Sequence, residues 1–101
     1  MSDEAIIRQT LQSGRKREDA FLLFRCLPTP GLSSRWCLRT PKRLGNAPQR
    51  NRIRRLMREF IRTNKFIWPT ECAIVLSAKP AAQAATLEQI AQSIAELLRN
   101  E

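Results

Sequence analysis

The sequence predicts a single-domain α+β protein, a two-layer α/β sandwich with the element order α-β-β-α-β-α. A chain of 101 residues has the size of one domain, residues 1–101, and room for only a thin core. Three segments carry the apolar spacing of amphipathic helices, and three shorter segments are rich in the apolar residues typical of strands.

The first helix is expected over residues 4–13. Ser2 or Asp3 can cap its N-terminus, because a side-chain oxygen there accepts from a first-turn N–H, and Gly14 can end it. The buried face is expected to contain Ile6, Ile7, Thr10 and Leu11. The charged segment RKRED, residues 15–19, is expected to be a connection.

Two strands are expected over residues 20–27 and 35–40. AFLLFRCL is apolar and aromatic and ends before Pro28, and PTPGLSS, residues 28–34, has the prolines and glycine of a turn. So short a connection predicts an antiparallel arrangement. Pro41 cannot donate to a sheet ladder, so the second strand should end there or lie at an edge.

The segment LGNAPQRNRIRRLMREFIRTNK, residues 44–65, is expected to form a helix with two different faces. Asn46 suits the N-cap, and Pro48 suits the first turn, where a missing N–H is harmless. The apolar residues recur at i, i+3, i+4, i+7 and i+8: Ile53, Leu56, Met57, Phe60 and Ile61. We expect this face to pack on the sheet and the arginines to face solvent together.

The last part of the chain predicts a strand and a helix. CAIVLSA, residues 72–78, is an almost continuous apolar run, as expected of a central strand covered on both faces. After a link over residues 79–85, Thr86 and Gln89 form a capping-box pattern. The apolar face of this helix would contain Leu87, Ile90, Ile94, Leu97 and Leu98.

The positive charge is concentrated in one part of the chain. The net charge is +9, yet residues 35–65 alone contain eleven Lys/Arg and a single acid, Glu59. The other residues carry seven bases and eight acids. A nearly neutral scaffold with one basic segment is typical of nucleic-acid-binding proteins.

Six of the seven basic residues between Arg50 and Lys65 are arginine, whose planar fork bridges phosphate oxygens. The alternative is a solvated face with i,i+4 ion pairs, but Glu59 is the only acid available. Asn51 either hydrogen-bonds RNA or is an ordinary first-turn polar residue. Membrane-surface binding fits less well, because the apolar face of this helix is needed for the core.

The sequence disfavours several other classes of protein. The chain has no histidine, and its acids are scattered, so protein-based phosphodiester hydrolysis is not expected. It has no apolar run long enough to cross a membrane and no secretory signal pattern at its start. Cys26, Cys37 and Cys72 form no metal or disulfide pattern and suit buried positions in a reducing cytoplasm.

The stretch KRLGNAPQRNRIRRLMRE, residues 42–59, resembles the central segment of the bacterial ribonuclease P protein component. That family has a basic lead containing Gly and Asn-Ala, followed by R-N-R-I-K-R, and here only position 54 exchanges Lys for Arg. The element order agrees along the whole chain. The resemblance implies an α/β sandwich with a left-handed parallel β-α-β crossover through the arginine-rich helix, against the usual right-handed rule.

The resemblance also implies a function. The protein would be a subunit of an endoribonuclease that hydrolyses precursor tRNA to remove the 5′ leader, with the RNA subunit as catalyst. Mg²⁺ would be held mainly by RNA, and no cofactor would be tightly bound by the protein alone. The implied partners are the ribonuclease P RNA, with one protein for each RNA, and the 5′ leader, but neither membrane nor DNA.

The residues that match the family fall into two groups. The RNA-contacting helix and its preceding loop would supply Lys42, Arg43, Gly45, Asn46, Arg50, Asn51, Arg52, Arg54, Arg55, Arg58 and Arg62. Gly45 would allow close backbone approach, or simply provide a turn with positive φ. A cleft for the leader, between the sheet and the first helix, would involve Phe24, Arg25 and Arg39.

The cleft departs from the family pattern. The usual aromatic residues of the first helix are replaced by Ile7, Thr10 and Leu11, so stacking from that helix is lost. Phe24 could still stack on the leader or could pack in the core. Arg39 should face solvent or RNA, because burying it unpaired would be costly.

Two other functions remain as alternatives. One is a basic ribosomal or RNA-chaperone-like protein without a role in tRNA processing. The other is a DNA-binding module with the arginine helix in a major groove. The DNA alternative is weaker, because the helix also presents a broad apolar face to the sheet.

Overall fold

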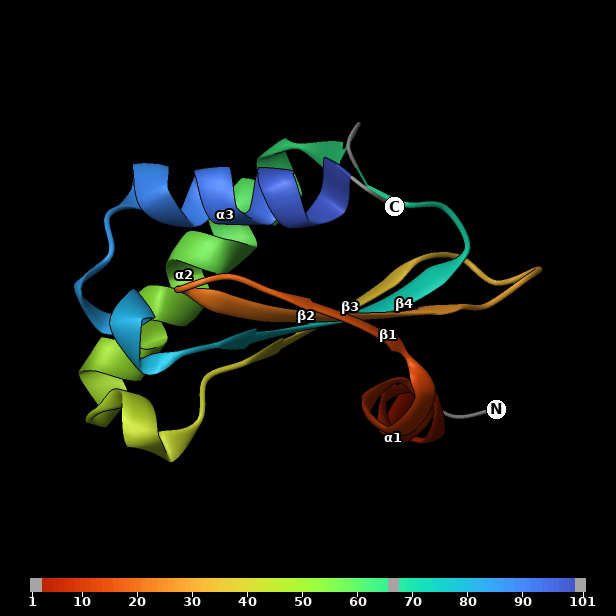
Figure 1. Ribbon diagram of the computed structural model, residues 1–101, viewed down its shortest axis with the longest axis horizontal. Helices are drawn as coiled ribbons and strands as arrows, with labels where there is room; N and C mark the ends of the chain where they lie inside the picture. Colours follow the sequence, from red (N-terminus) through yellow and green to blue (C-terminus); the bar gives the residue numbers. More distant parts are fainter. Residues whose placement is uncertain (1–2, 66–67, 100–101) are drawn as a thin grey trace.

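The computed structural model describes residues 3–65 and 68–99. Its elements in chain order are α1 (Asp3–Ser13), β1 (Arg15–Glu18), β2 (Leu22–Pro28), β3 (Arg35–Arg39), the 3-10 helix η1 (Lys42–Leu44), α2 (Ala47–Thr63), β4 (Cys72–Ala78), the 3-10 helix η3 (Pro80–Ala84) and α3 (Leu87–Arg99). Figure 1 shows α1 and α3 on opposite sides of the sheet. The predicted single-domain α+β class is confirmed, with its helices divided between the two faces of the sheet.

The four-stranded sheet has the order β1-β2-β4-β3. β4 is antiparallel to β2 and parallel to β3. β2 and β3 therefore run in opposite directions, as predicted from their short connection, but β4 lies between them. The parallel pair β3 and β4 is joined through α2, and the left-handed crossover implied for this unit stays a prediction.

The prediction of a connection over residues 15–19 was wrong, because Arg15–Glu18 forms the edge strand β1. It pairs antiparallel with β2, from Arg15 opposite Cys26 to Glu18 opposite Leu23. Its four charged residues carry no apolar alternation, which is why the sequence pattern does not reveal a strand. Charge on an edge strand discourages pairing with other chains.

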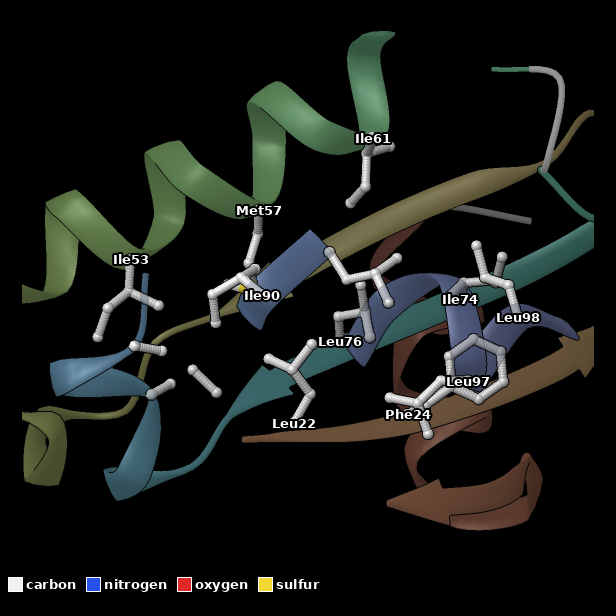
Figure 2. Packing of buried hydrophobic residues seen from close by; sticks show 14 of the residues in the cluster. Leu22, Phe24, Ile53, Met57, Ile61, Ile74, Leu76, Ile90, Leu97 and Leu98 are labelled. Atoms are coloured by element: carbon white, nitrogen blue, oxygen red, sulfur yellow. The ribbon is translucent and has the colours of Figure 1, made fainter. Parts of the chain in front are cut away.

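The main core lies between the sheet and the helices α2 and α3 (Figure 2). Its sheet residues include Leu22, Phe24, Ile74 and Leu76, and its helix residues include Ile53, Met57, Ile61, Ile90, Ile94, Leu97 and Leu98. On the other face of β4, Ala73 and Val75 are also buried. The prediction of a central strand covered on both faces is confirmed.

The predicted starts of α2 and α3 are also confirmed, whereas α1 begins at Asp3 and the other cap proposed for it, Ser2, lies outside the described residues. Asn46 Oδ1 accepts from Gln49 N at 3.0 Å, and Thr86 Oγ1 accepts from Gln89 N at 3.2 Å. One predicted core position was wrong: Leu87 is 48% exposed. It is the first residue of α3, ahead of the turn that meets the sheet.

In α1, Ile6 and Thr10 are buried as expected, and Ile7 and Leu11 are half-buried. Thr10 Oγ1 donates to Ile6 O at 2.8 Å, which satisfies the hydroxyl inside the core. The helix ends at Ser13, directly before the predicted stop at Gly14. α1 therefore covers the second sheet face with aliphatic side chains.

Candidate nucleic-acid interface

Helix α2 has the two faces that its sequence predicts. Ile53, Met57 and Ile61 are buried, and Leu56 and Phe60 are partly buried against the same core. The polar residues of the helix that lie exposed include Asn51, Arg52, Arg55, Arg58 and Arg62. Packing of the apolar face thus leaves the basic face outward.

Two arginines of α2 are tied to the scaffold. Arg52 Nη2 donates to Ala85 O at 3.0 Å, just before α3. Arg54 Nη2 donates to Thr40 Oγ1 at 2.6 Å, just after β3. A guanidinium has five N–H donors, so each of these side chains keeps donors for another partner.

The other arginine side chains of α2 make no hydrogen bond or ion pair outside this helix in the described part of the chain. Within residues 3–65 and 68–99, Arg55 and Arg58 make no hydrogen bond or ion pair, and Arg50 Nε is buried without an acceptor. Arg62 is paired with Glu59 at 2.7 Å. Arg55 and Arg58 are three residues apart and hence neighbours on the helix surface, where their repulsion favours an anionic partner.

The basic loop before α2 adds Lys42 and Arg43, which are exposed, while Leu44 anchors the loop in the core. Gly45 has φ 131°, where an L side chain would be strained and would also meet the Gln49 side chain. The turn explanation for Gly45 therefore holds. Gln49 Oε1 accepts from Asn46 N at 2.8 Å, so this turn is locked to the start of α2.

The predicted leader residues Arg25 and Arg39 share the face of the sheet that α1 covers. Arg25 lies opposite Val75, and Arg39 lies opposite Ser77. Val75 and Ser77 are two residues apart on β4, so all four side chains are on one face, and the side chains that alternate with them along the strands point to the main core. Arg39 is exposed, which confirms that it faces solvent. Beside α1 this face has a narrow cavity of about 50 Å³ lined by aliphatic residues and by Arg35, Trp36 and Cys37.

Phe24 is not available to this surface, which corrects its assignment as a leader-cleft residue. Its side chain is fully buried in the main core (Figure 2). Arg25, the next residue of β2, therefore points to the opposite face of the sheet. The alternation of side chains along a strand separates adjacent residues in this way. Of the two roles that the sequence allows for Phe24, the structure selects core packing.

The sequence reasoning missed an aromatic pair at the C-terminal end of the basic face. The rings of Trp36 and Trp68 lie 5.6 Å apart between centroids, at an interplanar angle of 59°. The available signal was that both tryptophans of the chain flank the arginine helix. Only the fold brings them together, because Trp36 precedes α2 in the chain and Trp68 follows it.

The packed scaffold and its outward arginines define a small α+β nucleic-acid-binding protein with a basic helical surface. None of the helices at residues 3–65 and 68–99 combines the length and apolar character needed to span a bilayer.

The family model described as Ribonuclease P matches residues 1–101, and the chain belongs to that family. The Ribonuclease P protein component of Desulfovibrio desulfuricans is 36% identical over 92 residues, which cover 87% of this chain and 71% of that protein. The corresponding protein of Brevibacillus brevis is 38% identical over 58 residues, 57% of this chain and 46% of that protein. The resemblance seen in residues 42–59 is thereby confirmed.

Solved structures agree on the fold. The RNase P protein of Staphylococcus aureus superimposes with a TM-score of 0.86 at 23% identity, covering 99% of this chain and 92% of that one. The RNase P protein from Thermotoga maritima gives a TM-score of 0.88 at 17% identity, covering 100% of this chain and 96% of that one. The mixed sheet and its three helices are thus the fold of these proteins.

Proposed function

We propose that this chain is the protein subunit of a ribonuclease P, which binds the RNA subunit through α2 and the loop before it. The observation that carries the proposal is the outward basic face of α2 in a chain that belongs to the Ribonuclease P family. On this face, Arg55 and Arg58 make no ion pair or hydrogen bond with any other described residue. Bound RNA phosphates would relieve the repulsion among these side chains and release counterions.

The proposed RNA-binding surface has a free part and a positioned part. Arg55, Arg58, Asn51, Lys42 and Arg43 project from the scaffold. Arg52 and Arg54 are held by scaffold oxygens, so their remaining N–H donors are presented in fixed directions. Such preorganisation reduces the entropy lost when RNA binds. Gly45 and Asn46 contribute through the shape of the turn, and Arg50 and Arg62 extend the surface along the helix.

In this proposal the RNA subunit carries out phosphodiester hydrolysis and holds Mg²⁺, the metal that supplies charge stabilisation at the phosphate. The protein donor set fits this division, because the described residues contain no group of three or more His, Cys, Asp or Glu side chains that could hold a metal ion. The chain instead supplies cations that screen the repulsion between the RNA subunit and the precursor tRNA. One protein molecule would bind each RNA subunit.

The precursor tRNA leader would bind on the sheet face that carries Arg25 and Arg39. With Phe24 buried and no aromatic side chain on α1, this surface lacks the aromatic platform that usually holds unpaired bases. We therefore assign it an electrostatic role toward leader phosphates. It should discriminate little among leader sequences.

The proposed compartment is the cytoplasm. Cys26, Cys37 and Cys72 are free thiols, which suits a reducing compartment.

The test is reconstitution of cleavage at low Mg²⁺ with the cognate RNA subunit and a precursor tRNA that has a 5′ leader. We expect the protein to accelerate single-turnover cleavage. The double variant Arg55→Gln/Arg58→Gln should lose most of this gain, whereas Arg8→Gln/Arg99→Gln, with the same loss of charge at exposed sites on α1 and α3, should keep it. Tight RNA binding without faster cleavage would instead favour the basic ribosomal or chaperone-like alternative.

A further inference from the structure

A hollow of about 380 Å³ lies beside the basic helix, between α2 and the edge strand β3. We call it the tryptophan pocket. It is lined by Trp36, Leu38, Arg54, Arg58, Ile61, Arg62, Lys65 and Trp68. Its volume falls within the range of small-molecule sites, which begins at about 300 Å³.

One side of the tryptophan pocket is aromatic and apolar. Trp68 is held in place because its Nε1 donates to Ile61 O at 2.9 Å, near the end of α2. Trp36 lies against it with tilted rings, and both side chains are only partly buried against the core. Trp36 Nε1 is buried yet has no hydrogen-bond partner among the described residues, and an unmet buried donor is costly.

The rim of the tryptophan pocket is cationic, with Arg54, Arg58, Arg62 and Lys65 among its lining residues and no acid among them. Arg62 is partly neutralised by Glu59 at 2.7 Å. Within residues 3–65 and 68–99, Arg58 and Lys65 make no ion pair. The pocket thus offers π-faces and unpaired positive charge within the same small volume.

The tryptophan pocket is separate from the surface assigned to the leader. Trp36 and Leu38 alternate with Cys37 and Arg39 along β3, so the two pairs point to opposite faces of the sheet. The pocket opens on the α2 side, and Arg39 lies on the α1 side. A ligand in the pocket would therefore continue the contact made by the basic face of α2.

We propose that the tryptophan pocket takes one unpaired nucleotide of a bound RNA. Its base packs against the indoles of Trp36 and Trp68, and its phosphate lies on Arg58 and Lys65. Base stacking on aromatic side chains combined with nearby cations is the chemistry of single-stranded nucleic-acid sites. The inference rests on the proposed function, since the RNA that α2 binds supplies the nucleotide.

A simple covering role for the two indoles accounts for less of the structure. Two aromatic rings that only seal the core edge require neither an open volume beside them nor cations around it. A bare phosphate site, in turn, requires no aromatic wall. The nucleotide is the ligand that uses both halves of the pocket.

The chain provides its own probe for this pocket. It contains two tryptophans and no tyrosine, so its tryptophan fluorescence comes from the pocket alone. We expect a five-nucleotide single-stranded RNA to quench or shift this emission in a saturable manner. A labelled copy of the same RNA gives the affinity of each variant by fluorescence anisotropy.

Matched variants separate stacking from packing. Trp36→Leu keeps an apolar side chain at the core edge but should weaken binding of the short RNA by about 5- to 150-fold, the loss expected for one stacked base. Trp36→Phe should restore most of it. Arg58→Gln should weaken binding, whereas Arg99→Gln, which removes one exposed charge at the end of α3, should not.

The nucleotide can come from the RNA subunit or from the precursor tRNA leader, and the emission distinguishes them. A change on addition of the RNA subunit alone assigns the nucleotide to that RNA. A change that appears only with a leader oligonucleotide or the precursor tRNA assigns it to the leader. Either result supports the pocket.

The inference is overturned if neither RNA changes the emission while the protein still accelerates cleavage at low Mg²⁺, a result that leaves the proposed function intact. It is also overturned if Trp36→Leu, folded by circular dichroism and thermal melting, binds the short RNA as wild type does. A saturable change in emission without faster cleavage would support the pocket and count against the proposed function.

Discussion

Helices α2 and α3 begin with the same device and pack in the same core, yet present opposite surfaces to solvent. Asn46 with Gln49 and Thr86 with Gln89 form reciprocal capping boxes, each with both backbone N–H groups satisfied. The outward side of α3 carries Glu88, Gln89, Gln92, Glu96 and Arg99, whereas that of α2 is dominated by arginine.

The difference shows which part of a helix is constrained by the fold. Apolar residues and caps fix where each helix begins and which face it buries, so they are of the same kind in α2 and α3. The outward face has no packing partner, and its composition is free to serve another purpose. A run of arginines with a single acid, which opposes folding by self-repulsion, therefore points to an external partner.

The largest stability effects should be equal in the two helices. Met57→Ala in α2 and Ile94→Ala in α3 each empty a fully buried site and should lower the free energy of unfolding by about 2–5 kcal/mol. Urea denaturation of each variant measures this. If only one of the two destabilises the protein, the helices do not share one cooperative core.

The outward faces should differ in RNA binding instead. Arg55→Gln/Arg58→Gln should reduce the slope of log affinity against log salt by roughly 0.7–0.9 for each lost phosphate contact, while the free energy of unfolding changes by about 0.5 kcal/mol or less. Gln92→Ala on α3 should change neither quantity. Filter binding to the RNA subunit from low to high salt, together with urea denaturation, tests the pair. Equal loss of folding and of binding in the arginine variant would mean that these side chains support the core.

Removing the N-cap side chain should cost α2 and α3 the same amount of stability. Asn46→Ala and Thr86→Ala each remove one side-chain acceptor from a first-turn N–H and should each cost about 1 kcal/mol of stability. Thermal melting of both variants is the measurement. A further loss of RNA affinity in Asn46→Ala alone, at a temperature where both variants are folded, would show that this turn also contacts RNA.

The smallest effect concerns an ion pair outside both helices. The Lys79 ammonium, 2.7 Å from Glu18 and hydrogen-bonded to it, lowers the pKa of that carboxyl below its usual value, with a smaller contribution from Lys16. A lowered folded-state pKa stabilises the protein above the unfolded-state pKa, and the benefit is lost as pH falls through the folded-state pKa. The pair is half-exposed, so the effect is small.

Melting temperatures of wild type and Glu18→Gln should therefore differ slightly at pH 7, with wild type higher. The difference should disappear once the pH falls below the folded-state pKa of Glu18. A difference that persists unchanged in acid would mean that Glu18 stabilises β1 by something other than its charge.

Local patterns in the sequence predicted much of this molecule. The caps at Asn46 and Thr86, the buried face of α2 and the apolar run of β4 all depend on residues within a few positions of one another. The residues proposed to contact RNA through α2 follow from the same periodicity, because a helix that buries Ile53 and Met57 must turn Arg55 and Arg58 outward.

The predictions that failed depended on partners distant in the chain. The strand β1 exists because β2 offers it a free edge, and its own residues show no strand pattern. Adjacent positions in β2 send Phe24 into the core and Arg25 to the opposite face, a choice that depends on which side α2 and α3 occupy. Leu87 fits the apolar spacing of α3, yet its side chain is exposed.

The sequence by itself determined the single α+β domain, the positions of the helices, the basic face and the family, because periodicity, capping and a contiguous motif are properties of neighbouring residues. Tertiary structure alone decided the insertion of β4 between β2 and β3 and the meeting of Trp36 with Trp68 beside the arginines. Strand order and pockets arise from contacts between segments far apart in the chain, and such contacts leave no periodic trace in either segment.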